Sequence, residues 1–535
     1  MAEKLSDLIV EAAERREDAV ALRHAGRGMS YGALARAVAA GARGLMGLSL
    51  ARGDRVAIYL DKRFETVIAM LAASAAGAVF IPLNPLLRPP QVAYAMRDCG
   101  ARVLVTSGTR VQALAEALGD CPALTHIVLV EDGTKAEKIP AISRIATLAW
   151  EALLDEDAAG RAPHRAIDSD VAAILYTSGS TGMPKGVVLS HGNMLTGAKS
   201  VSGYLKNTES DRILAVLPFS FDAGLSQLTT GFAVGATIVT MTYLLPRDVV
   251  RQCAKEEING LTCVPPLWIQ LAREDWPAES AAGIRYFANT GGHMPRPVLE
   301  RLRALMPNAK PYLMYGLTEA FRSTYLPPEE VDRRPDSIGK AIPHAEILVV
   351  REDGSECEPG EPGELVHRGP LVALGYWNDP ERTAERFRPA PGRPDGVCLP
   401  EIAVWSGDTV RKDSDGFLYF VGRRDEMIKT SGYRVSPTEV EEAVYASGLV
   451  GEAVALGIPH PEQGQAIVVV ATPADGAVLD AEGILAHCRP ILPRYMVPAS
   501  IVARESLPRN PNGKIDRKRM ADELGDLFRE GANET

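Results

Sequence analysis

The sequence contains few cysteines and no paired-cysteine motif. Seven cysteines are scattered over 535 residues, and no two of them are spaced as CxxC. An odd and scattered set argues against a disulfide framework and against a cysteine-held zinc site. We therefore expect these cysteines to be small, buried hydrophobic residues.

Long apolar runs are also missing. No segment runs for about eighteen apolar residues without interruption, which is the length that a membrane-spanning helix needs. The N-terminus, MAEKLSDLIVEAAERRED, mixes charges into a helical pattern and lacks the apolar stretch of a signal peptide. We therefore predict no membrane span and, by default, a location in the cytoplasm.

The charged residues do not form a basic stripe. The formal net charge is −10, from 58 Lys and Arg against 68 Asp and Glu that are mixed along the chain. Because a phosphodiester backbone is held by clustered basic residues, nucleic acid is excluded as the expected partner.

The chain is too long for a single compact core. Its 535 residues predict at least two domains, and its 46% hydrophobic residues can fill them. Apolar runs at 55–60, 101–105 and 125–130 alternate with helix-like stretches such as 65–76, which is the pattern of an α/β fold. Residues 131–170 look like a surface connection.

The pattern changes in the second half of the chain. A second α/β region spans 190–340, and glycines then separate short β-type runs over 354–416, which predicts a β-rich subdomain. After Asp425 follow a helix-like EVEEAV segment and two strand-like runs. We place the domain boundary there, which gives domains of residues 1–424 and 425–535.

The most informative stretch is TSGSTGMPKG, which joins two apolar runs. Glycines allow backbone N–H groups to turn towards an anion, hydroxyls add donors, and Lys185 adds positive charge. It is not a Walker P-loop, because the residues after it look like a strand and not a helix. It predicts a cradle for a triphosphate, with a solvated loop as the alternative. The cradle residues are Thr177, Ser178, Gly179, Ser180, Thr181, Gly182 and Lys185.

Three shorter motifs offer further chemistry. The YGLTE segment ending in Thr318 and Glu319 combines an aromatic ring, a turn, a hydroxyl and a lone carboxylate, which suits a nucleotide with Mg²⁺, although Thr318 could instead cap a helix. Asp408, in SGDT, is expected in a turn, either gripping ribose hydroxyls or forming an ordinary Asx turn. Lys514 lies in a Pro/Gly/Asn loop, where a solvated lysine is the default.

Taken in order, these motifs resemble those of the adenylate-forming superfamily, which includes acyl-CoA synthetases, amino-acid adenylation domains and luciferases. The cradle, YGLTE, SGD, GRRDE and PNGK follow one another between Ser30 and Met520. The resemblance implies an α/β fold with a large N-terminal domain of two α/β subdomains and a β-barrel. A small, mobile α+β lid would be hinged at Asp425.

The resemblance also implies a two-step reaction. A carboxylate attacks the α-phosphate of Mg·ATP, which gives an acyl-adenylate and pyrophosphate, and a thiol then expels AMP. The cradle would hold the β- and γ-phosphates. The remaining nucleotide contacts would come from Gly291 and Tyr315 at adenine, Thr318 at the α-phosphate, and Asp408 and Arg423 at the ribose.

The other implied roles concern catalysis. Glu319 would bind Mg²⁺, and Lys514 would bridge the carboxylate and the α-phosphate in the first step. Because the thiol must approach where that lysine had been, lid rotation about Asp425 would bring 431–434, with Arg434, over the site for the second step.

The segment LPFSFDAGL at 217–225 occupies the superfamily's acyl-pocket motif. Amino-acid-activating members have Phe-Asp at this point, so Asp222 hints at a substrate ammonium. Alternatively, Arg322 neutralises Asp222 or grips a second substrate carboxylate, or Asp222 caps a helix beginning at Ala223. The expected pocket residues are Phe221, Asp222, Gly224, Ser226, Thr290, Met314 and Arg322.

The runs FSFDAGLSQLTTGFAVGA and YGLTEAFRSTYLPPEEVDRRPDSIGK also look like acyl-CoA ligases associated with bacterial exosortase systems. No phosphopantetheine-attachment pattern follows Lys514, so free CoA is a simpler acceptor than a separate carrier protein. The sequence therefore predicts an AMP-forming ligase that uses ATP, Mg²⁺ and CoA on a small carboxylic acid. The alternative is a stand-alone amino-acid adenylation enzyme that loads a carrier protein. The formation of a homodimer is left open.

Overall fold

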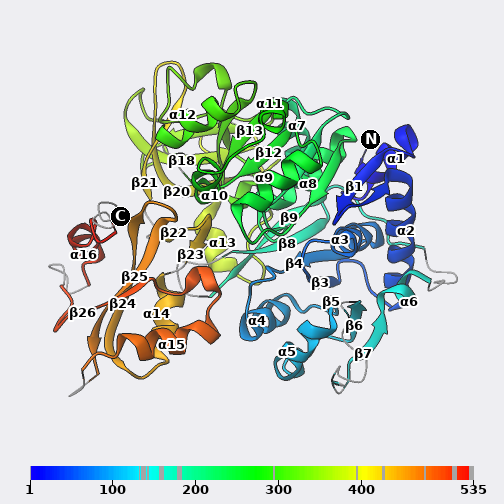
Figure 1. Cartoon of the computed structure of the whole chain (residues 1–535), viewed down its shortest axis with the longest axis horizontal. Coiled ribbons are helices and arrows are strands. Elements are labelled where there is room, and N and C mark those ends of the chain that lie inside the picture. The colour runs from blue at the N-terminus through cyan, green and yellow to red at the C-terminus, as the bar shows by residue number, and fades with distance from the viewer. Residues whose placement is uncertain are drawn as a thin grey trace.

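A computed structural model of the chain describes residues 2–131, 133, 140, 142, 144–155, 162–177, 183–292, 294, 296–392, 396–423, 428–435, 437–474, 478–508 and 515–528. The described elements form three β-sheets with helices packed against them (Figure 1). None of the described helices is long and apolar enough to cross a membrane.

The first sheet has seven strands in the order β7-β6-β5-β3-β4-β8-β9. Their bounds are β3 (Arg55–Tyr59), β4 (Val79–Pro82), β5 (Val103–Ser107), β6 (His126–Val130), β7 (Ala146–Ala149), β8 (Val171–Thr177) and β9 (Lys185–Ser190). All neighbouring pairs are parallel except β8 with β9. The three apolar runs predicted near the N-terminus are thus confirmed as strands β3, β5 and β6.

Helices cover this sheet. They are α2 (Tyr31–Gly47), α3 (Phe64–Ala76), α4 (Pro89–Cys99), α5 (Gly108–Gly119) and α6 (Trp150–Asp155), with α1 (Asp7–Arg16) before them. The prediction that residues 131–170 are only a connection is wrong, because β7 and α6 lie within that range. The strand adds an edge to the sheet beside β6, and Trp150 and Leu153 of α6 are buried in the core.

The second sheet begins with parallel strands in the order β14-β13-β12-β10-β11-β1, and β2 lies antiparallel beside β1. The bounds are β1 (Val20–His24), β2 (Arg27–Ser30), β10 (Arg212–Ala215), β11 (Thr237–Thr240), β12 (Gly260–Cys263), β13 (Tyr286–Asn289) and β14 (Lys310–Tyr315). The helices of this part are α7 (His191–Tyr204), α8 (Asp222–Val234), α9 (Pro246–Lys255), α10 (Pro265–Leu271), α11 (Ala278–Gly283) and α12 (Arg296–Leu305).

Antiparallel strands continue the same sheet beyond β14, in the order β15-β16-β21-β20-β18-β17, with β19 beside β20. They are β15 (Thr324–Leu326), β16 (Ser337–Ala341), β17 (Glu346–Val350), β18 (Pro362–Arg368), β19 (Phe387–Pro389), β20 (Ile402–Lys412) and β21 (Leu418–Arg423), accompanied by η2 (Thr318–Ala320), η3 (Pro328–Glu330) and α13 (Pro380–Arg386). The predicted β-rich subdomain is therefore present. Its closure into a barrel stays a prediction, because the strand order is open with β17 at its edge.

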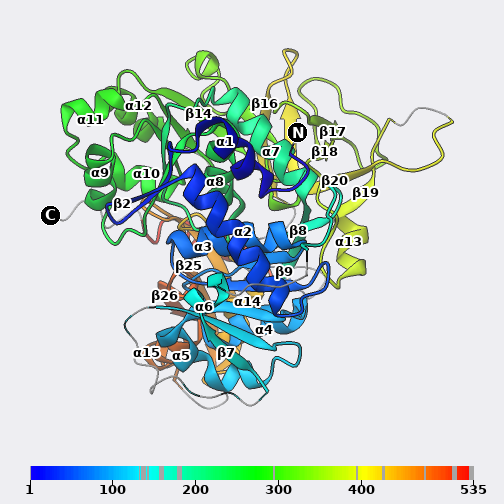
Figure 2. The same ribbon diagram turned by 90° about the vertical axis from the view of Figure 1, so that its right-hand side faces the viewer.

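The main hydrophobic core lies between the first two sheets. One cluster of buried residues joins helices α2, α3, α7 and α8 with strands of both sheets, including Phe80 of β4 and Ile238 of β11. Figure 2 shows α1 and α2 running along the flank where the two parts meet. The two α/β regions thus share a core, which fixes the relative position of their strand ends.

The third sheet belongs to the C-terminal part and has the order β23-β22-β25-β24, with β26 beside β25. Its elements are β22 (Ile428–Thr430), β23 (Tyr433–Val435), α14 (Pro437–Tyr445), β24 (Val450–His460), β25 (Gly464–Pro473), α15 (Ala481–Ile491), η4 (Arg494–Met496), β26 (Ser500–Ala503) and α16 (Arg517–Glu523). It has its own core, built from β24, β25, α14 and α15. The domain boundary at Asp425 stays a prediction, because that residue lies outside the described residues.

The cysteines are free, as the sequence predicts. Six are buried, whereas Cys398 is exposed, so the expectation of burial is wrong at that one position.

Candidate active site

The β8–β9 pair brings the two described ends of the predicted cradle together. Thr177 and Lys185 are directly opposite in the antiparallel register, while residues 178–182 lie outside the described residues. The Thr177 hydroxyl is shielded from solvent and has no hydrogen-bond partner in the part of the chain that the structure describes. Since a buried hydroxyl without a partner is costly, this atom marks a place for a ligand's acceptor oxygen.

Lys185 belongs to a compact group of three side chains. Its Nζ donates to Glu319 Oε1 at 3.1 Å and to the Tyr376 hydroxyl at 2.7 Å, and the Tyr376 hydroxyl donates to the same Glu319 oxygen at 2.6 Å. Lys185 Nζ also lies 4.3 Å from the centre of the Tyr376 ring. The structure thus joins two predicted residues, a cation and a carboxylate, through a tyrosine.

Sequence reasoning missed Tyr376, which a long loop brings to the site. Leu374 N donates to Val188 O and Trp377 N donates to Gly186 O, so the loop runs beside β9 as an extra strand-like segment. No sequence motif marks this tyrosine, because its place in the site comes from pairing with a distant strand.

The residues predicted for adenine and ribose also lie together. The Tyr315 hydroxyl donates to Asp408 Oδ2 at 2.5 Å, and Asp408 is only 1% exposed. Arg423 lies opposite Asp408 in the β20–β21 pairing, although its side chain lies outside the described residues. The predicted nucleotide residues therefore meet where the end of β14 approaches the paired strands β20 and β21.

The prediction that Asp408 sits in a turn is wrong. It lies within β20, where Gly407 has a φ of +68° and the register with β18 shifts between Glu364 and Val366. Ser406 Oγ donates to Leu365 O and accepts from Asp408 N. The SGD motif is therefore a β-bulge that re-aims one carboxylate, a use for which glycine is suited.

Asp222 begins helix α8, and Phe221 takes the cap position before it. Asp222 Oδ1 accepts from the Thr318 hydroxyl at 3.2 Å, and Oδ2 accepts from Arg322 Nη1 at 2.9 Å. Asp222 is 3% exposed and Arg322 is 2% exposed. Of the alternatives drawn from the sequence, the structure has the one in which these two charges neutralise each other. Thr318 itself lies within η2 and does not cap a helix.

A strained turn aims Arg322 inwards. Phe321 has a φ of +57°, in the region that bulky residues rarely adopt, and its ring packs where a Cβ on Gly197 would come within 2.5 Å of it. Gly197 therefore leaves the space that the Phe321 ring fills. The reversal at Phe321 then turns the next side chain, Arg322, towards Asp222.

Gly224 has a packing role. A Cβ at this position would lie 2.0 Å from Pro218 O, so the first turn of α8 rests directly on the backbone of the preceding loop. This contact sets the start of α8 and, with it, the position of Asp222.

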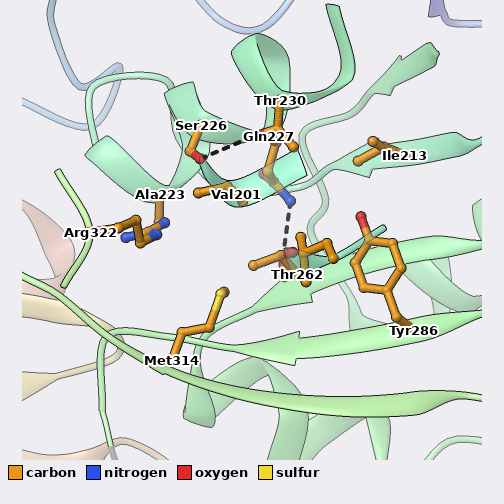
Figure 3. A pocket seen from close by; sticks show the side chains of 11 residues that line it. Val201, Ile213, Ala223, Ser226, Gln227, Thr230, Thr262, Tyr286, Met314 and Arg322 are labelled. Atoms are coloured by element: carbon orange, nitrogen blue, oxygen red, sulfur yellow. Dashed lines mark hydrogen bonds between the residues drawn. The ribbon is translucent and has the colours of Figure 1, made fainter. Parts of the chain in front are cut away.

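The remaining predicted pocket residues divide between two cavities. An outer cleft of about 130 Å³ is lined by Thr177, Phe221, Asp222, Thr290, Gly291, Thr318 and Arg322. An inner cavity of about 10 Å³ is lined by Ser226, Met314 and, again, Arg322. Figure 3 shows the inner cavity, with Arg322 at one end and Tyr286 and Ile213 at the other.

The C-terminal part closes one side of the outer cleft. Gly432 and Tyr433, at the β22–β23 hairpin, line it, and a Cβ on Gly432 would lie 2.7 Å from Val264 Cγ2. Gln91 Nε2 of α4 donates to Glu439 Oε1 of α14 at 3.1 Å. The structure thus has residues 431–434 beside the site, while Asp425, Lys514 and the Arg434 side chain lie outside the described residues.

The described residues fit a phosphate-bound Mg²⁺ better than a protein-held metal. No group of three or more His, Cys, Asp or Glu side chains that could hold a metal occurs in the described ranges. Glu319 and the neighbouring Thr318 supply oxygen atoms, and Mg²⁺ prefers one or two carboxylates together with substrate phosphates. Thr177, whose hydroxyl has no partner among the described residues, lines the outer cleft together with Thr318.

Comparisons with known proteins agree over nearly the whole chain. The model of the AMP-binding enzyme family matches residues 9–377, and that of the AMP-binding enzyme C-terminal domain matches residues 439–514. A feruloyl-CoA synthase of Amycolatopsis is 30% identical, covering 95% of this chain and 96% of the relative. A long-chain-fatty-acid–CoA ligase of Salmonella typhimurium is 29% identical, covering 97% and 94%. The solved structure of an o-succinylbenzoate CoA synthetase from Bacillus subtilis is similar with a TM-score of 0.80 at 26% identity, covering 96% of this chain and 98% of the other.

Proposed function

The chain belongs to the AMP-binding enzyme family, and from this membership we propose that it is an AMP-forming acid–thiol ligase that joins a carboxylic acid to CoA using ATP. The single observation that carries the proposal is the outer cleft. Its lining includes both Thr177 of the cradle and Thr318, which donates to Asp222 of the expected acyl pocket. A carboxylate and a triphosphate can therefore meet in one enclosed space. The CoA relatives, which match over nearly their whole length, support the choice of acceptor.

In the first step, a substrate oxygen attacks the α-phosphate and pyrophosphate leaves. Attack of one anion on another is slow until their charges are offset, and fixed positive groups in a closed site do this best. Lys185 and the Thr177 hydroxyl hold the β- and γ-phosphates, and Thr318 meets the α-phosphate. Mg²⁺, held by Glu319, would supply further positive charge to the phosphates. Lys514 bridges the two reacting groups.

The nucleoside occupies the region around Tyr315, Gly291 and Asp408. Asp408 offers the ribose hydroxyls its carboxylate, which now accepts from Tyr315 at 2.5 Å. Its almost complete burial keeps that carboxylate in one orientation. Arg423, opposite it in the β20–β21 pairing, approaches the ribose and phosphate.

In the second step, a thiol attacks the acyl carbonyl and AMP leaves. The hairpin at 431–434 lies against the cleft as the resemblance implies for this step, which supports a lid that exchanges Lys514 for the hairpin. Both oxygens of Asp222 have protein partners, so the site offers little to a substrate ammonium, and a carboxylate–CoA ligase fits better than an amino-acid adenylation enzyme. Seven free cysteines fit a reducing compartment such as the cytoplasm.

The test is an assay of the full chain with ATP, Mg²⁺, CoA and a broad panel of carboxylic acids, with AMP, pyrophosphate and thioester measured separately. We expect AMP and thioester in equal amounts for the accepted acids. Omission of CoA should leave acid-dependent pyrophosphate exchange intact, which separates the two steps. Absence of AMP with every acid would contradict the proposal, and AMP without CoA thioester would point to another acceptor.

A further inference from the structure

The Asp222–Arg322 pair forms the boundary between the two cavities. Arg322 lines both the outer cleft and the inner cavity, whereas Asp222 lines the outer cleft. The pair is joined by a 2.9 Å hydrogen bond and is almost completely buried. A substrate that enters from the outer cleft with its carboxylate near Thr318 therefore meets this guanidinium at its far end.

Arg322 has hydrogen-bonding capacity that the protein does not use. Its Nη1 donates to Asp222 and, at 3.4 Å, to Phe321 O. Its Nε is shielded from solvent and has no acceptor among the described residues. A guanidinium carries five N–H donors, and a buried charged donor without an acceptor is unfavourable. An acceptor atom on the substrate would satisfy it.

The net charge of the Asp222–Arg322 pair indicates which kind of substrate acceptor the site favours. Asp222 and Arg322 together carry no net charge, so an uncharged oxygen from a ketone, ether, amide or hydroxyl leaves the buried group neutral. A second carboxylate would add an uncompensated negative charge to a buried site. A substrate ammonium would find both oxygens of Asp222 occupied by Thr318 and Arg322.

The space behind the pair limits the length of the acyl group. The inner cavity measures about 10 Å³, close to the space of a single water molecule, which needs about 10–15 Å³. Six of its lining residues are polar, namely Ser226, Gln227, Thr230, Thr262, Tyr286 and Arg322. Figure 3 shows the hydrogen bond between the Ser226 and Thr230 hydroxyls, and the hydrogen bond that Gln227 donates to the backbone carbonyl of Thr262. The inner cavity therefore does not have the room that a long alkyl chain needs.

We propose that Arg322 is a specificity-determining residue and that the acyl substrate is a compact acid with an uncharged hydrogen-bond acceptor at the end remote from its carboxylate. This inference rests on the proposed ligase function. The substrate carboxylate faces Thr318 and the nucleotide, and the remote acceptor takes a hydrogen bond from the Arg322 guanidinium.

The test uses pairs of acids that differ only in the acceptor. Levulinate is compared with isocaproate, and para-acetylbenzoate with para-isopropylbenzoate, because each pair exchanges a ketone oxygen for a methyl group. Glutarate, γ-aminobutyrate and laurate represent a second carboxylate, an ammonium and a long chain. We expect kcat/KM for AMP formation to favour the ketone by about tenfold or more in the pair that fits the cleft.

The double variant Asp222→Asn with Arg322→Met removes the guanidinium, keeps an oxygen for Thr318 and leaves no buried charge. We expect it to abolish or reverse the preference within the pair, with isocaproate or para-isopropylbenzoate gaining. The control is Asp211→Asn with Arg285→Met, which removes another ion pair with a buried carboxylate and should leave the preference unchanged.

The outcomes separate this inference from the function itself. If no acid yields AMP, the proposed function fails. If acids yield AMP but the methyl analogues match the ketones, or glutarate, γ-aminobutyrate or laurate is the best substrate, the function stands and the role of Arg322 is overturned. A double variant that keeps the ketone preference overturns it as well.

Discussion

Two cation–carboxylate pairs lie at or beside the lining of the outer cleft, one at its proposed phosphate end and one at its proposed acyl end, and the two pairs differ in kind. At the phosphate end, Lys185 and Glu319 are 3.1 Å apart, with side chains 15% and 9% exposed. At the acyl end, Arg322 and Asp222 are 2.9 Å apart, with side chains 3% and 4% exposed. Lysine is a flexible point charge, whereas the guanidinium of arginine is a rigid fork.

Because of this difference, we expect the two pairs to have different roles in the reaction. At the phosphate end, Lys185 and Tyr376 converge on one Glu319 oxygen, and an incoming triphosphate with its metal can take over those contacts. At the acyl end, separation of the charges would leave each one buried, which costs several kcal/mol. We therefore expect the Lys185–Glu319 pair to rearrange during the reaction and the Arg322–Asp222 pair to stay closed and select the substrate.

Lys514→Ala should give the largest effect, because the role proposed for Lys514 is in the chemical step and not in the binding of ATP. We expect acid-dependent pyrophosphate exchange to fall by several orders of magnitude, since a group that acts in the transition state affects kcat more than binding. The Kd for ATP, measured by calorimetry, should change by less than about threefold. An equal loss of ATP binding would show that Lys514 belongs to the phosphate end instead.

Glu319→Gln tests the phosphate end. We expect kcat for adenylate formation to fall by about 10²- to 10³-fold, because a neutral amide holds Mg²⁺ poorly and leaves Lys185 without its anion. The free energy of unfolding should fall by about 1–3 kcal/mol, because Lys185 loses its anion but is 15% exposed and keeps Tyr376 as an acceptor. A urea titration and a pyrophosphate-exchange assay provide the two measurements.

The control for that variant is Tyr376→Phe, which removes the hydroxyl and keeps the ring beside Lys185. The hydroxyl accepts from the Lys185 ammonium and donates to the Glu319 carboxylate, and a hydrogen bond to a charged group contributes about 1.5–3 kcal/mol. We expect a smaller loss in rate than for Glu319→Gln, because Tyr376→Phe keeps the carboxylate. If Glu319→Gln behaved like Tyr376→Phe, the proposed metal ligation by Glu319 would be wrong.

Arg322→Met tests the acyl end. It leaves the buried Asp222 carboxylate without its cation, so we expect a loss of about 3–5 kcal/mol in the free energy of unfolding. Arg303→Met is the matched control, because Arg303 pairs with Asp332 on the surface, where side chains are 39% and 71% exposed. That change should cost about 0–1 kcal/mol. Equal losses in Arg322→Met and Arg303→Met would contradict the expectation that the buried Arg322–Asp222 pair stays closed.

Sequence reasoning located the groups of the site better than their surroundings. Lys185 and Glu319 were predicted from local motifs, and their separation of 134 positions is closed by the fold. The alternating apolar runs predicted strands β3, β5 and β6 of the first sheet, because burial on both faces demands such runs. The exosortase-associated resemblance and the role of Lys514 stay predictions.

What the sequence could not reveal depends on contacts between distant segments. Tyr376 gains its position from pairing with β9, and no local pattern encodes that pairing. Asp408 was expected in a turn, since glycine and aspartate favour turns, but strand β18 on one side and β21 on the other hold the motif as a bulge. The strained Phe321, which aims Arg322, is stabilised by packing against a glycine far away in the chain.

His367→Gln should have the smallest effect on activity, and it tests the burial of the acyl end through the pH dependence of the free energy of unfolding. His367 is fully buried on β18, and its Nδ1 lies 3.0 Å from Ser323 Oγ, directly after Arg322. Burial lowers the pKa of His367 to about 3 from its usual 6.5. Above pH 6.5 the imidazole is neutral in both folded and unfolded chains, so its contribution to stability is complete there.

As the pH falls from 6.5 towards 3, His367 binds a proton in the unfolded chain but stays neutral in the folded chain. The free energy of unfolding therefore decreases by about 1.4 kcal/mol per pH unit from this group alone. At pH 5 the loss from His367 is about 2 kcal/mol. In His367→Gln this part of the slope should disappear between pH 6.5 and 5, while pyrophosphate exchange at neutral pH stays within about threefold. Urea titrations at several pH values would measure it. An unchanged slope would mean that the folded protein accepts the proton at this position, and that the acyl end is less tightly sealed than the buried ion pair indicates.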